Sequence, residues 1–117
     1  MSSLLKQDKI KILELQETIE QKLPKELYCL YCYGSRVKQH RIDADFDILL
    51  ITNDDVDWRT EEKIIDIVID FGIDNDIVFD PQVLSKQNFE RNLSVMPFIK
   101  NVKKEGIRIW NRRPRKI

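Results

Sequence analysis

The sequence predicts an α+β fold, a small mixed β-sheet with helices packed on one side. Amphipathic helical segments alternate along the chain with short apolar runs rich in aromatic and β-branched residues. Their order, helix, strand, turn, strand, helix, strand and further helices, brings the apolar runs together in one sheet. At 117 residues the chain has the length of one domain. We therefore expect a single domain over 1–117, with its core at about 27–110 and a basic tail at 111–117.

The first half of the chain predicts one helix and two strands. Apolar residues recur at helical spacing over 4–23, and Pro24 ends this pattern. The runs at 27–33 (LYCLYCY) and 45–52 (DFDILLIT) have the composition of strands. Between them, 36–44 reads as a short turn or helix followed by a loop.

The second half predicts a helix over 58–71 that stops at Gly72 and a third strand over 76–79 that ends at Asp80-Pro81. Further downstream we expect helices over 85–92 and 95–104 and a short strand over 107–110.

Charge and hydropathy exclude several classes of protein. The 20 basic and 20 acidic residues balance, so the chain as a whole lacks the charge of a general nucleic-acid binder. No apolar run approaches the roughly 20 residues of a membrane span, and the first residues lack the features of a signal peptide. We expect a cytoplasmic protein.

Cys29 and Cys32 have the spacing of a redox or zinc pair. In a strand, however, a separation of three places them on opposite faces. We expect packed thiols.

Two aspartates open the strand at 45–52. Asp45 and Asp47 point to the same face, and two carboxylates about 6 to 7 Å apart repel each other by roughly 2 to 3 kcal/mol at an effective dielectric near 20. A hard divalent cation offsets that repulsion, and Mg²⁺ favours carboxylate, phosphate and water oxygens. The apolar run that follows Asp47 sets this pair apart from the Asp-x-Asp pairs in loops.

Gly34-Ser35 directly follows the strand at 27–33. Such a glycine allows the backbone to approach an anion closely, and the serine adds a hydroxyl. A strand end with a helix N-cap is the alternative interpretation. The order of the motifs favours phosphate binding, because nine residues after Gly34-Ser35 an Asp-x-Asp pair opens an apolar strand.

The segment YGSRVKQHRIDADFDILLI, at 33–51, resembles the signature of the DNA polymerase beta nucleotidyltransferase superfamily. Within it, the sequence is most similar to the short bacterial minimal nucleotidyltransferases, and the resemblance covers roughly 27–110. It implies a third carboxylate at the start of the next strand, here Asp76 before Ile77-Val78-Phe79. Asp74 and Asp80 lie in phase with Asp76, so spacing alone does not select among the three. Ala44 stands where relatives often carry Ser.

The resemblance implies two-metal nucleotidyl transfer with release of pyrophosphate. Asp45, Asp47 and Asp76 would hold two Mg²⁺ ions, for which Mn²⁺ can substitute. Gly34 and Ser35 would hold the outer phosphates, and Arg36 or Lys38 would neutralise the leaving pyrophosphate.

The reaction we expect is transfer of a nucleoside monophosphate, AMP from ATP, to a hydroxyl acceptor. The resemblance also implies a helical partner of the HEPN type, with 4–23 and 85–104 as candidate docking segments. The alternative function is an antitoxin or binding module that neutralises its partner by complex formation without catalysis. Whether nucleic acid serves as the acceptor stays open.

Overall fold

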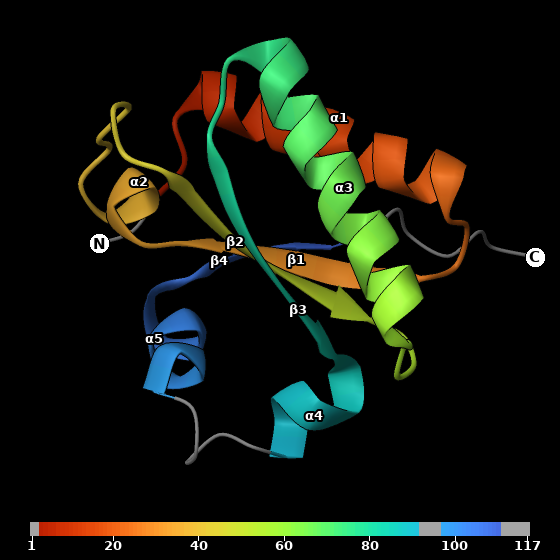
Figure 1. Ribbon diagram of the computed structural model, residues 1–117. Helices are drawn as coiled ribbons and strands as arrows, with labels where there is room; N and C mark the ends of the chain where they lie inside the picture. The colour runs from red at the N-terminus through yellow and green to blue at the C-terminus, as the bar shows by residue number, and fades with distance from the viewer. Residues whose placement is uncertain (1–2, 92–96, 111–117) are drawn as a thin grey trace, which may run out of the picture.

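The strands of the computed structural model, which describes residues 3–91 and 97–110, form one mixed four-stranded sheet in the order β3-β2-β1-β4 (Figure 1). Strand β1 (Leu27–Tyr33) pairs antiparallel with β2 (Phe46–Thr52) and with β4 (Ile107–Trp110). Strand β2 pairs in parallel with the edge strand β3 (Phe79–Ser85). The mixed sheet and the α+β class predicted from the sequence are confirmed.

Helices α1 (Lys6–Lys22) and α3 (Trp58–Asn75) cover one face of the sheet (Figure 1). Ile12, Leu15 and Ile19 of α1 are fully buried, as their helical spacing predicts. The core on this face includes Ile12, Leu15, Ile19, Leu30, Ile48, Leu50, Ile64 and Val68.

Helices α4 (Lys86–Arg91) and α5 (Pro97–Glu105) lie on the opposite face (Figure 1). Phe89 of α4 and Ile99 and Val102 of α5 belong to a second core cluster with Leu49 and Ile51 of β2. The prediction of helices on one side only is therefore wrong. The continuous apolar run of β2 explains the difference, because a strand buried on both faces does not alternate apolar and polar residues.

The two cysteines lie on opposite faces of β1, as predicted. Cys29 belongs to the cluster beneath α4 and α5, and Cys32 to the cluster beneath α1 and α3. Both are free thiols, and burial raises the pKa of Cys29 to about 11. This is the state of packed thiols rather than of a reactive pair.

The boundary between α3 and β3 differs from the prediction. Helix α3 continues past Gly72 and ends at Asp76, which has the left-handed backbone conformation with φ 57°. A Cβ atom at Gly72 would overlap the Ile77 carbonyl oxygen, so this glycine allows the returning chain to pack closely rather than stopping the helix. Strand β3 therefore begins at Phe79 and not at Asp76, and Asp80 and Pro81 lie within it.

No helix within residues 3–91 and 97–110 is long and apolar enough to span a bilayer. The predicted basic tail at 111–117 lies outside the described residues.

Candidate active site

Asp47 of β2 and Asp80 of β3 are direct partners in the parallel register. Equivalent positions on neighbouring strands point to the same face of a sheet, and these two side chains are close enough to share a hydrogen bond. Burial, the charge and hydrogen bond of Asp80 and the charge of Asp45 together raise the pKa of Asp47 from 3.8 to about 6. The end of the sheet thus carries a pair of carboxylates that resists holding two negative charges.

Gly34 lies against the carboxylate of Asp47. It follows β1 with φ 82°, a conformation that favours glycine, and a Cβ atom here would overlap Oδ2 of Asp47. Tyr33, just before it, is the register partner of Asp47 on β1. The Gly-Ser turn and the Asp-x-Asp strand, separated in sequence, therefore meet at one point.

Asp45 precedes β2 and is exposed, and its negative charge helps to raise the pKa of Asp47. Asp76 is also exposed, but it lies at the end of α3 beside Ile73 and Val78. The charges that raise the pKa of Asp47 come from Asp80 and Asp45 and not from Asp76. The expectation that Asp76 supplies the third carboxylate of this cluster is corrected in favour of Asp80, because the strand on which it depended begins three residues later.

Arg36 does not point toward the Gly-Ser turn as a phosphate ligand would. Its side chain is buried and forms two hydrogen bonds of 3.2 Å with the buried carboxylate of Asp8 on α1. It also donates to the carbonyl oxygens of Ile42 and Ala44, both at 3.2 Å. The prediction that Arg36 neutralises pyrophosphate is therefore wrong. Because Arg36 anchors the loop that leads into Asp45, its role in the structure is to position the Asp-x-Asp strand.

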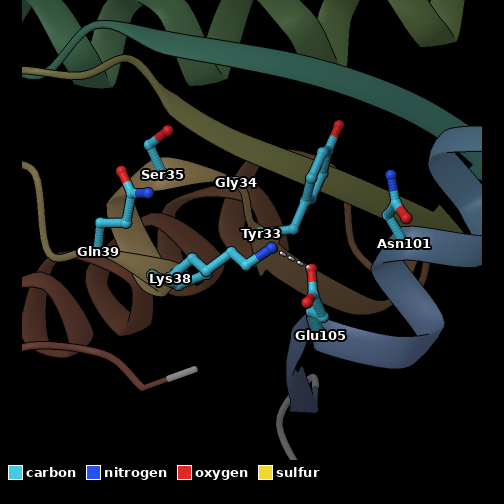
Figure 2. A pocket seen from close by; sticks show the side chains of 8 residues that line it. Tyr33, Gly34, Ser35, Lys38, Gln39, Asn101 and Glu105 are labelled. Atoms are coloured by element: carbon cyan, nitrogen blue, oxygen red, sulfur yellow. Dashed lines mark ion pairs between the residues drawn. The ribbon is translucent and has the colours of Figure 1, made fainter. Parts of the chain in front are cut away.

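A cavity of about 300 Å³ opens beside the Gly-Ser turn and is lined by residues of β1, the short helix α2 (Ser35–Lys38) and α5. Lys38 lines it and forms a 3.1 Å ion pair with Glu105, in which the Lys38 side chain is exposed and the Glu105 side chain is partly buried. In Figure 2 the polar ends of Ser35, Tyr33 and Asn101 point to one side, away from the Lys38–Glu105 pair. Ser35 and Lys38 both line this cavity, with their polar ends on different sides of it.

Tyr33 was not predicted as a site residue. Burial and the charges of Asp47 and Asp80 raise the pKa of its hydroxyl to about 12, so the group stays protonated and can donate a hydrogen bond. The sequence held only a weak signal for it, namely a tyrosine that ends a strand directly before Gly34.

No group of three His, Cys, Asp or Glu side chains in the described part of the chain is arranged to hold a metal ion by itself. Mg²⁺ commonly takes only one or two carboxylates and completes its shell with substrate phosphates and water. The Asp47–Asp80 pair supplies two carboxylates whose mutual repulsion a cation would relieve. These residues therefore fit a divalent metal that binds together with a phosphate-bearing substrate.

The sheet, with the Gly-Ser turn and the aspartates at one end, defines the class: the chain has the fold of the minimal nucleotidyltransferases. A structure of the toxin–antitoxin complex MntA–HepT matches with a TM-score of 0.56 and 15% identity over 89% of this chain and 73% of that chain. The structure of the tri-AMPylated Shewanella oneidensis HEPN toxin in complex with MNT antitoxin matches with a TM-score of 0.54 and 16% identity, over 89% of this chain and 72% of that chain. A toxin–antitoxin structure with AMP-PNP matches with a TM-score of 0.56 and 19% identity, over 92% of this chain and 75% of that chain.

At these identities the likeness establishes the fold. No protein-family model and no curated protein matches the sequence.

Proposed function

We propose that this chain is a Mg²⁺-dependent nucleotidyltransferase that transfers AMP from ATP to a hydroxyl group on a HEPN-type protein partner. The observation that carries the proposal is the meeting of Gly34, Asp47 and Asp80 at one end of the sheet. Two structural neighbours support the choice of substrates, since one contains AMP-PNP and the other a tri-AMPylated HEPN toxin.

Asp45, Asp47 and Asp80 would hold Mg²⁺, with Mn²⁺ as a substitute, and Asp80 takes the role that was predicted for Asp76. When bound, the metal neutralises phosphate charge and lowers the pKa of the acceptor hydroxyl. The raised pKa of Asp47 supports this assignment, because a cation between the two carboxylates relieves the repulsion that raises it.

Gly34 and Ser35 would hold the outer phosphates of ATP, with Lys38 beside them. Lys38 is exposed and paired with Glu105, so it can exchange a carboxylate for a phosphate at little cost. Transfer forms a bond between the acceptor oxygen and the α-phosphorus and breaks the bond from that phosphorus to the bridging oxygen. Pyrophosphate leaves with the electron pair of the broken bond, next to the Gly-Ser turn.

A transfer assay tests this function. The purified chain is incubated with ATP labelled at the α-phosphate, Mg²⁺ and a HEPN-type protein encoded beside it. We expect label on the partner, none in EDTA and none with Asp47→Ala. Efficient transfer by the isolated chain to tRNA or a small molecule would contradict the protein acceptor, and label in EDTA would contradict the metal.

A second candidate is an antitoxin that acts by complex formation alone. The observation that favours it is that the structures sharing this fold include toxin–antitoxin complexes such as MntA–HepT. An Asp47→Asn variant separates the two functions. If it still binds and neutralises the partner with no transfer, complex formation suffices; if neutralisation is lost while binding persists, catalysis is required.

A further inference from the structure

A second cavity, of about 460 Å³, opens on the sheet face covered by α4 and α5. We call it the basic pocket. Its charged and aromatic lining consists of Lys86, Lys103, Arg108, Tyr28, Tyr31 and Phe89. One acidic residue, Glu90, also lines it, so cations outnumber anions three to one.

Two of the cations are held over aromatic rings. The Lys86 Nζ lies 4.4 Å from the centre of the Tyr28 ring, and the Lys103 Nζ lies 4.6 Å from that of Phe89. Within residues 3–91 and 97–110 neither lysine has a carboxylate at ion-pair distance. A ring restrains an ammonium group without neutralising it. Both lysines are therefore positioned and keep their full charge for an anionic ligand.

The third cation, Arg108 of β4, forms a hydrogen bond with the Tyr31 hydroxyl. The Tyr31 ring packs against that of Phe89 at a centre-to-centre distance of 5.2 Å, and both line the pocket. The floor of the pocket is thus fixed by β1 and β4, and its walls come from α4 and α5. Such a pocket is preformed, which lowers the entropy cost of binding.

The basic pocket continues the face of the sheet that carries the aspartates. Tyr33 and Asp47 are register partners, as are Tyr31 and Leu49, and Cys29 and Ile51. The pocket residues Tyr31 and Cys29 therefore lie two and four positions along β1 from Tyr33, or roughly 7 and 13 Å at the rise of a strand. The pocket and the Asp47–Asp80 pair therefore lie on the same face of the sheet, with the buried cluster of Leu49, Ile99 and Val102 between them.

We propose that the basic pocket binds an acidic segment of the protein acceptor and so docks that acceptor on the face of the sheet that carries the Asp47–Asp80 pair. This rests on the proposed function. Charge complementarity selects this occupant, because three cations and one anion line the pocket, and the pocket shares its sheet face with the Asp47–Asp80 pair. A base of single-stranded nucleic acid fits less well, because stacking needs open ring faces and the lysines cover those of Tyr28 and Phe89.

The test measures binding of a short, fluorescein-labelled, glutamate-rich peptide containing one tyrosine, by anisotropy at low and at physiological salt. We expect binding to the full chain that weakens by about 10-fold or more in Lys86→Glu/Lys103→Glu, since like charges across an interface repel. Binding should also weaken as salt rises. The matched control, Arg59→Glu/Lys63→Glu, makes the same charge change on exposed positions of α3 and should bind the peptide as the wild type does.

Lys86→Met/Lys103→Met keeps the apolar stems over the rings and removes only charge. It should fold as the wild type does by thermal melting and still lose most of the peptide affinity. Equal affinity in the wild type and this variant would overturn the proposal, and so would equal losses in the test and control variants. Tighter binding of a labelled single-stranded RNA that is lost in the same variant would overturn the assignment to a peptide.

AMP-PNP binding with Mg²⁺ should be unchanged in all three variants. This separates the two proposals: loss of peptide binding with intact nucleotide binding concerns the pocket alone. A wild type that binds the peptide and does not bind AMP-PNP would contradict the proposed function and leave the pocket supported.

Discussion

Asp47 lies directly opposite Asp80 across the parallel pair β2–β3, and the two carboxylates share a hydrogen bond. Gly34 packs against the same Asp47 carboxylate from β1. Residues at the end of β1, in β2 and in β3 thus meet at one end of the sheet. A ligand that occupies this end of the sheet must bring positive charge or displace a proton.

Asp80→Asn should lower AMP transfer by about 100-fold or more, because it removes one of two facing carboxylates from the site. Asp76→Asn makes the same chemical change at the end of α3 and serves as the matched control, with transfer expected near the wild-type value. A labelled-ATP assay compares the two. Loss with Asp76→Asn and retention with Asp80→Asn would restore the original sequence-based assignment.

Asp47→Asn should stabilise the metal-free protein at pH 7. The pKa of Asp47 is raised from 3.8 to about 6 in the folded state, so the folded protein holds a proton that the unfolded chain releases between these values. The contribution of Asp47 to the free energy of unfolding therefore falls as the pH rises from about 4 to 6. Above pH 6 the full destabilising effect of the ionised Asp47 remains. Asp47 is partly exposed, so we expect a gain of about 1 kcal/mol after allowing for solvent screening.

Urea denaturation in EDTA at pH 4 and pH 7 measures this effect. The stabilisation should be present at pH 7 and small at pH 4, and saturating Mg²⁺ should reduce it. A variant less stable than the wild type at both pH values would show that the carboxylate contributes favourable contacts instead.

Gly34→Ala should impair nucleotide binding more than folding. The added Cβ overlaps Oδ2 of Asp47 and requires a left-handed backbone at a non-glycine residue, which costs about 1–2 kcal/mol. Calorimetry with AMP-PNP and thermal melting test the two effects separately. Wild-type affinity in this variant would mean that Asp47 can move aside without loss of the site.

Asp8→Asn should destabilise the fold by about 3–5 kcal/mol, because it leaves the buried guanidinium of Arg36 without its charge partner. The double variant Asp8→Leu/Arg36→Met removes both charges and should recover much of this loss. Denaturant titration measures each variant. Additive losses in the double variant would show that the two side chains do not act as a pair.

The sequence located the elements that depend on local pattern. The bounds of β1 coincide with the predicted 27–33, and the Gly-Ser and Asp-x-Asp motifs meet as their order implied. These features depend on alternation and spacing within one segment, or on a turn between adjacent strands. Neighbours in the sequence carry that information.

Three features depended on tertiary contacts and were missed. The register of β3 against β2 selects Asp80 over Asp76, and a parallel register is set by packing such as the stacking of Phe46 on Phe79. The burial of Arg36 depends on Asp8, a residue of α1 that lies 28 positions earlier in the sequence. The second layer of helices depends on how α4 and α5 return to the sheet. No local sequence pattern specifies these tertiary contacts.

The most direct test of the account is calorimetric titration of the chain with AMP-PNP, in Mg²⁺ and in EDTA, for the wild type and Asp47→Ala. The clustered carboxylates repel a triphosphate unless a cation accompanies it. We expect binding by the wild type in Mg²⁺ and none in EDTA or in the variant. Equal affinity with and without the metal, or in the variant and the wild type, would contradict a metal-dependent nucleotide site at the Asp47–Asp80 end of the sheet.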